Sequence, residues 1–200
     1  MAIQHLIHSI KVAKEIGSKQ YVAVGMGNLG LVYRTTGEVE KAIDCLSQAV
    51  SIARDIGFKR LEGVHLGNLG IAYQVGGQIE PSIEALQQSI LVCRELGDLR
   101  SEAIAISNLG EVYLKLQRYE EAEVALRKAI LVGEETYPVL SGAARSSLAL
   151  LIAQRGQLDE AIELLKIGEP QVECHPEEHG KFLCRKAHVF RIGGDDVNAH

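Results

Sequence analysis

The sequence is poor in aromatic residues and has no tryptophan. Aromatic side chains make up 4% of its 200 residues, so a buried core has to be built from leucine, isoleucine, valine and alanine. Four cysteines in a chain of this length do not make a disulfide-stapled secreted scaffold. Positive charge is not in excess: the formal net charge is −5, whereas nucleic-acid-binding proteins usually carry a basic field. We therefore expect no nucleic-acid partner.

Long apolar runs are missing as well. Residues 147–153 form about the longest apolar stretch, well short of the roughly 18 residues that a membrane-spanning helix needs. Near the N-terminus, Gln4, His5 and Lys11 interrupt the apolar residues, unlike the core of a secretory signal peptide. The sequence therefore predicts a soluble, cytoplasmic protein with no membrane partner.

A 40-residue repeat organises the chain. The triplet Asn-Leu-Gly begins at Asn28, Asn68 and Asn108, and a tyrosine follows five residues after each asparagine. Small residues, leucines and glycines keep step with the triplet. A fourth copy arrives one residue early, and a fifth is cut off. A period of this length is the signature of stacked repeat architectures.

Each period predicts two helices. Apolar residues recur at steps of three and four, as in Ile43, Leu46 and Val50, which is helical spacing. Glycines such as Gly37 and Gly57 fall where each helix should end, because the left-handed residue that follows a helix is usually glycine.

A second set of glycines lies inside the first helix of each pair. Gly30, Gly70 and Gly110 occupy positions where glycine costs up to about 1 kcal/mol relative to alanine. The second helix offers small residues opposite them, beginning with Ala42 and Ser82. We expect the two helices of a pair to approach closely at these glycines.

The pattern has three departures. Gln117 stands where a turn glycine is expected, and Arg145 stands where the earlier copies have an apolar residue. The fourth step is 39 residues long and contains Pro138. These departures predict a local irregularity around residues 133–145.

The order Asn-Leu-Gly-x-x-Tyr, glycine, alanine, leucine, alanine resembles the tetratricopeptide repeat (TPR) in its 40-residue variety. This variety is found in Leu-Gly-Asn repeat adaptors and kinesin light chains. The resemblance implies an all-α fold, an α-α superhelix (solenoid) of stacked antiparallel helix pairs. It divides residues 1–200 into the second helix of a truncated repeat (1–17), four full repeats (18–57, 58–97, 98–137 and 138–172) and a last truncated repeat (173–200).

In such a superhelix the first helices line a concave groove. Asparagine is a poor residue for a helix interior, but its carboxamide offers both a donor and an acceptor to the backbone of an extended peptide. In the resembling adaptors, asparagines at the matching position contact the ligand backbone. The alternative is that these asparagines hydrogen-bond between adjacent repeats. The expected peptide-binding groove consists of Asn28, Leu31, Arg34, Asn68, Ile71, Gln74, Asn108, Glu111, Leu114 and Ser147.

These features predict a protein-protein interaction scaffold that binds an extended peptide or a helix of a partner, with no cofactor and no enzymatic activity. One alternative is a regulatory sensor whose peptide or small ligand controls an attached kinase, signalling ATPase or transcription regulator. A further alternative is a structural oligomer. The terminal helices, with apolar residues such as Ile7, Phe182 and Val189, lack capping partners. This favours a fragment of a longer protein or, alternatively, end-to-end self-association.

Two motifs resemble chemical sites. Residues 25–30 match the G-x-G-x-x-G dinucleotide fingerprint, but that fingerprint needs a strand before it and a βαβ unit around it. Cys174, His179, Cys184 and His188 offer zinc-type ligands without a Cys-x-x-Cys pair. We expect neither a nucleotide nor a catalytic centre, and we leave a metal site in the second stretch open.

Overall fold

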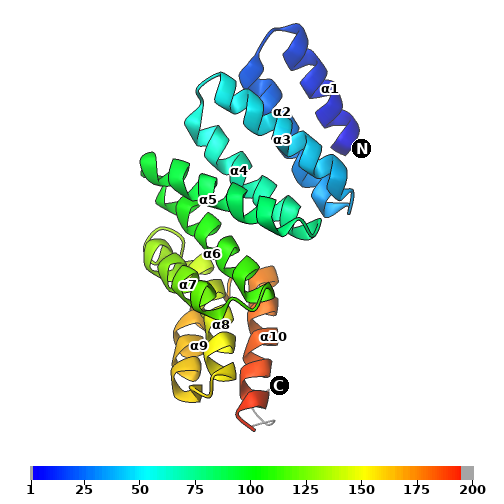
Figure 1. The fold of residues 1–200 in the computed structure, drawn as a ribbon. Helices are drawn as coiled ribbons and strands as arrows, with labels where there is room; N and C mark the ends of the chain where they lie inside the picture. Colours follow the sequence, from blue (N-terminus) through cyan, green and yellow to red (C-terminus); the bar gives the residue numbers. More distant parts are fainter. Residues whose placement is uncertain (1, 195–200) are drawn as a thin grey trace. The chain divides into compact units, whose positions relative to one another are not determined.

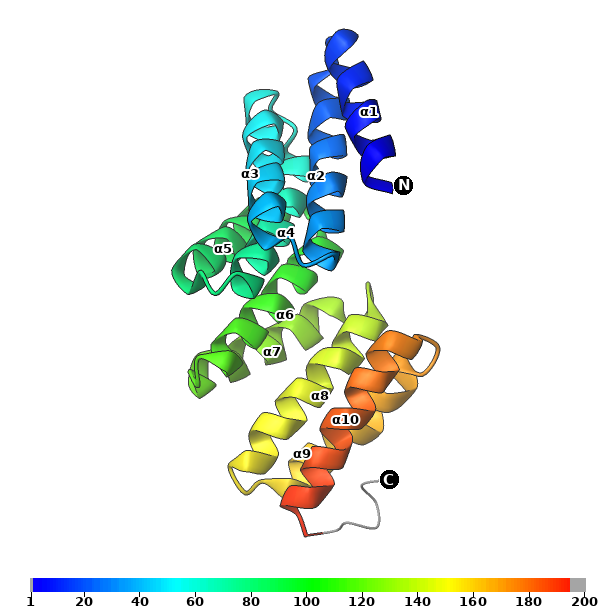
Figure 2. The same cartoon turned by 90° about the vertical axis from the view of Figure 1, so that its right-hand side faces the viewer.

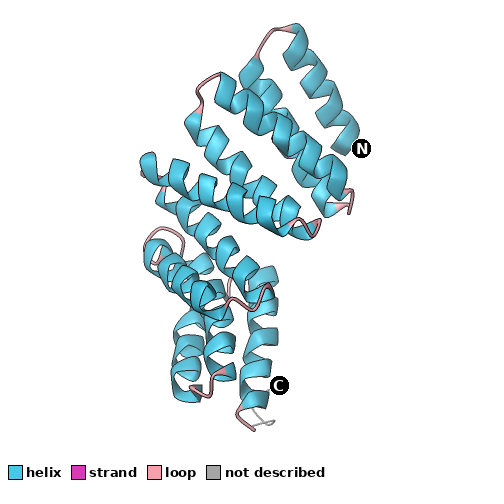
Figure 3. Cartoon of the chain, in the orientation of Figure 1, coloured by secondary structure: helices cyan, strands magenta, loops and turns pink. Residues whose placement is uncertain are grey.

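The computed structural model describes residues 2–194, and these residues form ten α-helices and no strand (Figure 3). None of these helices is long and apolar enough to cross a membrane. The fold is therefore all-α, as predicted, with antiparallel helix pairs. In chain order the helices are α1 (Ala2–Glu15), α2 (Lys19–Thr35), α3 (Val39–Asp55), α4 (Lys59–Val75), α5 (Ile79–Glu95), α6 (Leu99–Lys115), α7 (Tyr119–Gly133), α8 (Pro138–Gln154), α9 (Leu158–Val172) and α10 (Pro176–Ile192).

The chain divides into two compact units (Figure 1). Unit 1 runs to residue 105 and unit 2 begins at residue 106, so the division falls inside α6. In unit 1, α2 pairs with α3, α4 pairs with α5, and α4 also packs on α3. In unit 2, α8 pairs with α9. A single solenoid over residues 1–200 stays a prediction.

The core of unit 1 is aliphatic, as the scarcity of aromatic residues requires. Ile10, Met26 and Leu29 are buried together where α1 packs on α2. Leu46 and Leu66 belong to a second cluster shared by α3 and α4. Helical spacing of apolar residues places them on the faces that meet, and their burial is the main favourable contribution to folding.

The interior glycines lie where paired helices touch. A Cβ atom on Gly70 would lie 2.6 Å from Leu86 Cγ and 3.2 Å from the carbonyl oxygen of Ser82. Gly30 meets Leu46 in the same way, at 2.7 Å. The expected close approach is confirmed, but the neighbouring side chain is a leucine. Ser82, the small residue of the second helix, contacts Gly70 through its backbone carbonyl. Its Oγ also donates a hydrogen bond of 2.7 Å to the Gly70 carbonyl.

The turn glycines adopt the expected left-handed backbone. Gln117 occupies one of these turns with φ 58°, a conformation that is costly for a residue with a Cβ atom. The other seven turns have glycine with φ between 66° and 81°: Gly17, Gly37, Gly57, Gly77, Gly97, Gly156 and Gly194.

The irregularity expected around residues 133–145 lies at the junction of α7 and α8. α7 has 15 residues, against 17 for α3, and α8 begins directly at Pro138. Arg145 is 8% exposed. Its guanidinium donates to Glu134 Oε2 and to Gln171 Oε1, each at 2.6 Å. A charged link to the end of α7 and to α9 thus replaces the apolar contact of the earlier repeats.

The last helix packs inward. In unit 2, α10 lies against both α8 and α9, and most closely against α8 (Figure 2). In unit 1, by contrast, α4 packs on the preceding pair mainly through α3 and only lightly through α2. Phe182 and Val189 are fully buried, so the expectation that they lack a packing partner is wrong. Leu183 and Ile192 remain exposed on the outer side of α10.

Candidate binding surface

The predicted groove residues of unit 1 form one surface, which we call the amide face. It consists of Asn28, Leu31 and Arg34 on α2 and of Asn68, Ile71 and Gln74 on α4, two helices in contact. Asn28 is exposed and the other five are half-buried. Residues three apart share a helix face, so each helix contributes an amide, an aliphatic side chain and a second polar group that solvent reaches.

The asparagines of the repeat have no partner within the described part of the chain. The side chains of Asn28, Asn68 and Asn108 make no hydrogen bond to any described residue. Each is the tenth residue of its helix, nine after Lys19, Lys59 and Leu99, respectively. Hydrogen bonds between adjacent repeats therefore do not account for these asparagines.

Two further polar groups of the amide face are under-satisfied. Arg34 Nη1 and Gln74 Nε2 are buried, and neither has a hydrogen-bond partner among the described residues. Each is the sixteenth residue of its helix. Burial lowers the pKa of Arg34. Buried donors are nearly always satisfied in folded proteins, so these two need an explanation.

A buried histidine lies at the junction of α2 and α4. His65 is 5% exposed, and a Cβ atom on Gly27 would lie 2.0 Å from its Cε1. Burial lowers the pKa of His65, although the Ala23 carbonyl opposes this shift. Neither ring nitrogen has a partner in hydrogen-bond geometry, so the imidazole is neutral near pH 7. This contact was not predicted from the sequence, although Gly27, one of three glycines within α2, was a signal for it.

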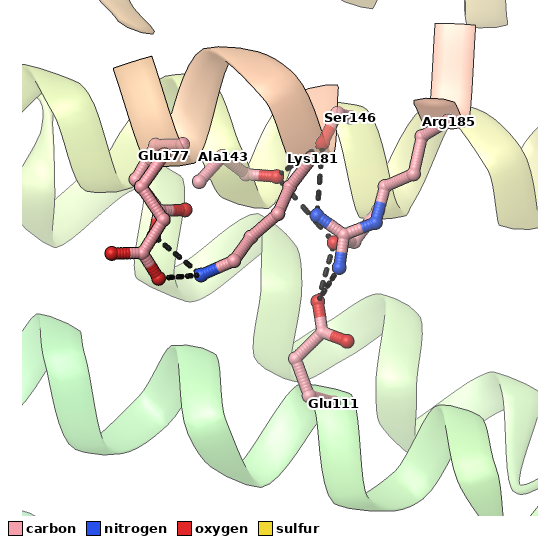
Figure 4. Close-up of polar contacts among 8 residues, drawn as sticks. Glu111, Ala143, Ser146, Glu177, Lys181 and Arg185 are labelled. Carbon is pink, nitrogen blue, oxygen red and sulfur yellow. Dashed lines mark hydrogen bonds and ion pairs between the residues drawn. The ribbon is translucent and has the colours of Figure 1, made fainter. Parts of the chain in front are cut away.

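Unit 2 uses the same positions differently. Asn108, Glu111 and Leu114 of α6 are half-buried, but Ser147 of α8 is only 2% exposed. The Ser147 hydroxyl donates a short hydrogen bond to Glu111 Oε1. Arg185 of α10 donates to the same oxygen at 3.1 Å (Figure 4).

The contacts of Arg185 were not predicted from the sequence. Arg185 also donates to Ser146 Oγ at 3.2 Å (Figure 4). Arg185 is the tenth residue of α10, as Ser147 is of α8, so both follow Asn28, Asn68 and Asn108 in the series. The step of 38 residues from Ser147 to Arg185 continues the shortened spacing of the last repeats.

Two clefts of unit 1 lie away from the amide face. One, of about 320 Å³, is lined by residues of α3, α4 and α5, including Arg54, Tyr73 and Gln88. The other, also about 320 Å³, lies between α1 and α2, with Ile10 and Lys14 at its wall. We place the candidate site on the amide face because its asparagines have no partner among the described residues, whereas Arg54 in the first cleft already bonds to Glu62 and Gln88.

The two motifs that resemble chemical sites have other settings. Residues 25–30 lie inside α2, and no strand precedes them within residues 2–194, so the setting of a dinucleotide motif is missing. Cys174 and Cys184 are exposed. Across the described residues no group of three His, Cys, Asp or Glu side chains is close enough to hold a metal ion.

Family comparisons agree with the helix pairs. Three family models, each described as a tetratricopeptide repeat, match residues 25–56, 61–132 and 142–166. Together they cover more than half of the chain. The chain belongs to the tetratricopeptide repeat family. Its sequence has no significant match among curated proteins.

Solved TPR structures share the fold. A Rap protein complexed with competence and sporulation factor has a TM-score of 0.83 at 21% identity, covering 99% of this chain and 56% of that one. TPR-like repeats from Podosopora anserina, described as a kinesin light chain, have a TM-score of 0.69 at 22% identity, covering 87% and 88%. YrrB, a TPR protein with an unusual peptide-binding site, has a TM-score of 0.58 at 18% identity, covering 96% and 87%.

Proposed function

We propose that the protein is a non-enzymatic interaction scaffold, and that the amide face of unit 1 binds an extended peptide of a partner protein. The observation that carries the proposal is the pair Asn28 and Asn68. Both lie at the tenth position of a first helix, both are reached by solvent, and neither hydrogen-bonds to a described residue. Each carboxamide would donate to a peptide carbonyl and accept from a peptide N–H, independently of the peptide sequence.

The solved relatives support this proposal. YrrB is described with a peptide-binding site, and the Rap structure is described with a bound factor. Between the asparagines, Leu31 and Ile71 supply half-buried aliphatic surface for peptide side chains. Asn108 has the same tenth position in α6.

The test is a set of alanine substitutions at Asn28, Asn68 and Asn108. We expect capture of peptide from a random decapeptide library to be lost, because each lost amide removes two hydrogen bonds worth about 1 kcal/mol apiece. Helicity and melting temperature should stay nearly unchanged, because no described residue loses a partner. Gln48→Ala, on the outer face of α3, is the matched control. A large drop in melting temperature with binding retained would show instead that the asparagines stabilise the packing of adjacent repeats.

The regulatory-sensor alternative stays a prediction. So does end-to-end self-association, for which exposed Ile7 and Ile16 of α1 and Leu183 and Ile192 of α10 offer apolar surface. Light scattering over a range of concentrations tests it, since a weight-average mass that stays at the monomer value excludes association through these helices.

A further inference from the structure

Four arginine and lysine residues among those described are not exposed, and three of them are paired. Arg145 bonds to Glu134, Arg185 bonds to Glu111, and Lys186 bonds to Glu169. In each case the cation approaches a carboxylate oxygen within 3.1 Å. For these three residues the chain thus supplies a counter-charge.

Arg34 is the exception. It is half-buried, and its side chain makes no hydrogen bond or ion pair to any described residue. Partial burial without a counter-charge costs free energy, because the guanidinium loses hydration and gains no acceptor. Arginine does not escape this cost by losing its proton at physiological pH. Arg34 is also the one charged residue of the amide face, so this surface carries a positive charge.

Unit 2 shows the arrangement that Arg34 lacks. There a guanidinium on one first helix, that of Arg185, bonds to the Glu111 carboxylate on another. A hydroxyl, that of Ser147, donates to the same oxygen. In unit 1, Gln74 on α4 has the same helical position as Arg34 on α2, and its Nε2 is a second donor. Arg34 has no acceptor among the described residues. The missing component is a carboxylate.

We propose that the peptide bound by the amide face carries a glutamate or aspartate side chain, and that Arg34, assisted by Gln74, binds its carboxylate. This inference rests on the proposed function. The acid is a side chain rather than the peptide's C-terminus, because Arg34 lies six residues beyond Asn28 along α2. At 1.5 Å per residue this is about 9 Å from the path set by the asparagines. A group at that distance is reached by a side chain that branches from the peptide backbone.

Binding of three decapeptide pools to the intact protein tests the inference. Each pool has random alanine, serine, valine and leucine positions and an acetylated N-terminus. The first has a central glutamate and an amidated C-terminus, the second a central glutamine and an amidated C-terminus, and the third a central glutamine and a free C-terminal carboxylate. We expect the glutamate pool to bind about tenfold more tightly than the amidated glutamine pool, as a charge-assisted hydrogen bond allows.

Variants of Arg34 distinguish the preference for an acidic side chain from peptide binding itself. Arg34→Gln should abolish the preference for glutamate while keeping the binding of the glutamine pool and the melting temperature. Arg34→Lys should keep part of the preference, because the charge remains without the planar fork. Arg191→Gln is the matched control: it is exposed and is the sixteenth residue of α10, as Arg34 is of α2. It should leave the preference unchanged.

Two results overturn the inference alone. One is equal binding of all three pools, and the other is a preference for the pool with the free C-terminus. Either result leaves the peptide-binding proposal standing. If no pool binds the wild-type protein, or if alanine at both Asn28 and Asn68 leaves binding intact, the proposed function itself fails and the inference fails with it.

Discussion

Units 1 and 2 use the same helical position for different purposes. At the tenth residue of the first helix, unit 1 has Asn28 and Asn68, whose carboxamides have no partner among the described residues. Unit 2 begins with the equally free Asn108 and then changes to Ser147 and Arg185, which are joined through Glu111. One position in a repeated fold thus leaves its polar group without a partner in one region and uses it in the protein's own packing in another.

The packing of the last helix explains this difference. In unit 2, α10 lies close against α8, because Phe182 and Val189 are buried beneath it. That approach brings Arg185 within reach of Glu111 on α6. In unit 1, α2 and α4 touch only lightly, so no side chain of this unit bridges their exposed amides. Whether these polar side chains stay without a partner therefore depends on how closely the first helices pack, as well as on which residues they carry.

The largest expected difference concerns the interior glycines. A Cβ atom on Gly70 would lie 2.6 Å from Leu86, whereas one on Gly110 would lie 3.0 Å from Leu126. We expect Gly70→Ala to lower the free energy of unfolding by about 2 kcal/mol, since overpacking outweighs the gain in helix propensity. Gly110→Ala should change it by less than about 1 kcal/mol. Denaturant unfolding followed by circular dichroism measures both, and equal costs would show that the two helix pairs are packed alike.

The second difference is the response to acid. His65 of unit 1 has a lowered pKa, while the equivalent seventh residue of α8 in unit 2 is Ala144, which does not titrate. Above pH about 6.5 the imidazole is neutral in both the folded and unfolded states. Below it the unfolded state takes up the proton first, so stability falls with pH by up to about 1.4 kcal/mol per unit.

We therefore expect His65→Ala to reduce the loss of stability between pH 7 and pH 5. The variant is less stable overall, because it leaves a cavity, but its slope against pH should be shallower. Glu62 is buried, but Arg54 and Lys59 hold the pKa of its carboxyl below the usual value. It makes the wild-type protein and the His65→Ala variant equally sensitive to acid, so its contribution cancels when the two slopes are compared. Equal slopes would mean that His65 is protonated as easily in the folded state.

The third difference concerns the two arginines. Arg185→Ala should lower the free energy of unfolding by about 1 kcal/mol, because the hydrogen bonds to Glu111 and Ser146 are lost from a partly buried site. Arg34→Ala should leave stability unchanged or slightly raised, because an unpaired, half-buried cation is removed. Chemical unfolding of the two variants side by side gives the result. A clear loss of stability in Arg34→Ala would show that this side chain has a structural role.

The smallest effect is expected at the turns. Gln117 has a left-handed backbone that glycine adopts without strain. Gln117→Gly should raise the free energy of unfolding by about 0.5 kcal/mol. The substitution relieves backbone strain in the folded state, and the larger conformational entropy of glycine in the unfolded state offsets part of that gain. The reverse change in unit 1, Gly77→Gln, should lower the free energy of unfolding by a similar amount. Melting temperatures that move in the same direction for both variants would contradict this account of the turns.

Periodicity was enough to predict the helix pairs. Their turn glycines and the close approach at Gly30 and Gly70 were also predictable, because each follows from local backbone and packing rules that every copy repeats. The register of the last repeats also followed from the pattern, although α7 and α9, with 15 residues each, are shorter than the 17-residue α3 and α5 and reduce the step. The bond of Arg185 to Glu111 was not predictable, because it depends on how closely α10 packs on α8. The contact of His65 with Gly27 depends on which side chain fills the gap between neighbouring first helices, and no period encodes that.

The most direct test of the account is the nuclear magnetic resonance of the side-chain amides. A titration of the protein, labelled with nitrogen-15, with the glutamate decapeptide pool follows the carboxamide signals of Asn28 and Asn68, with Gln48 as an internal reference. The account predicts large shifts for both asparagines and none for Gln48. Bound peptide without any shift at Asn28 and Asn68 would contradict it, because the amides would then take no part in holding the ligand.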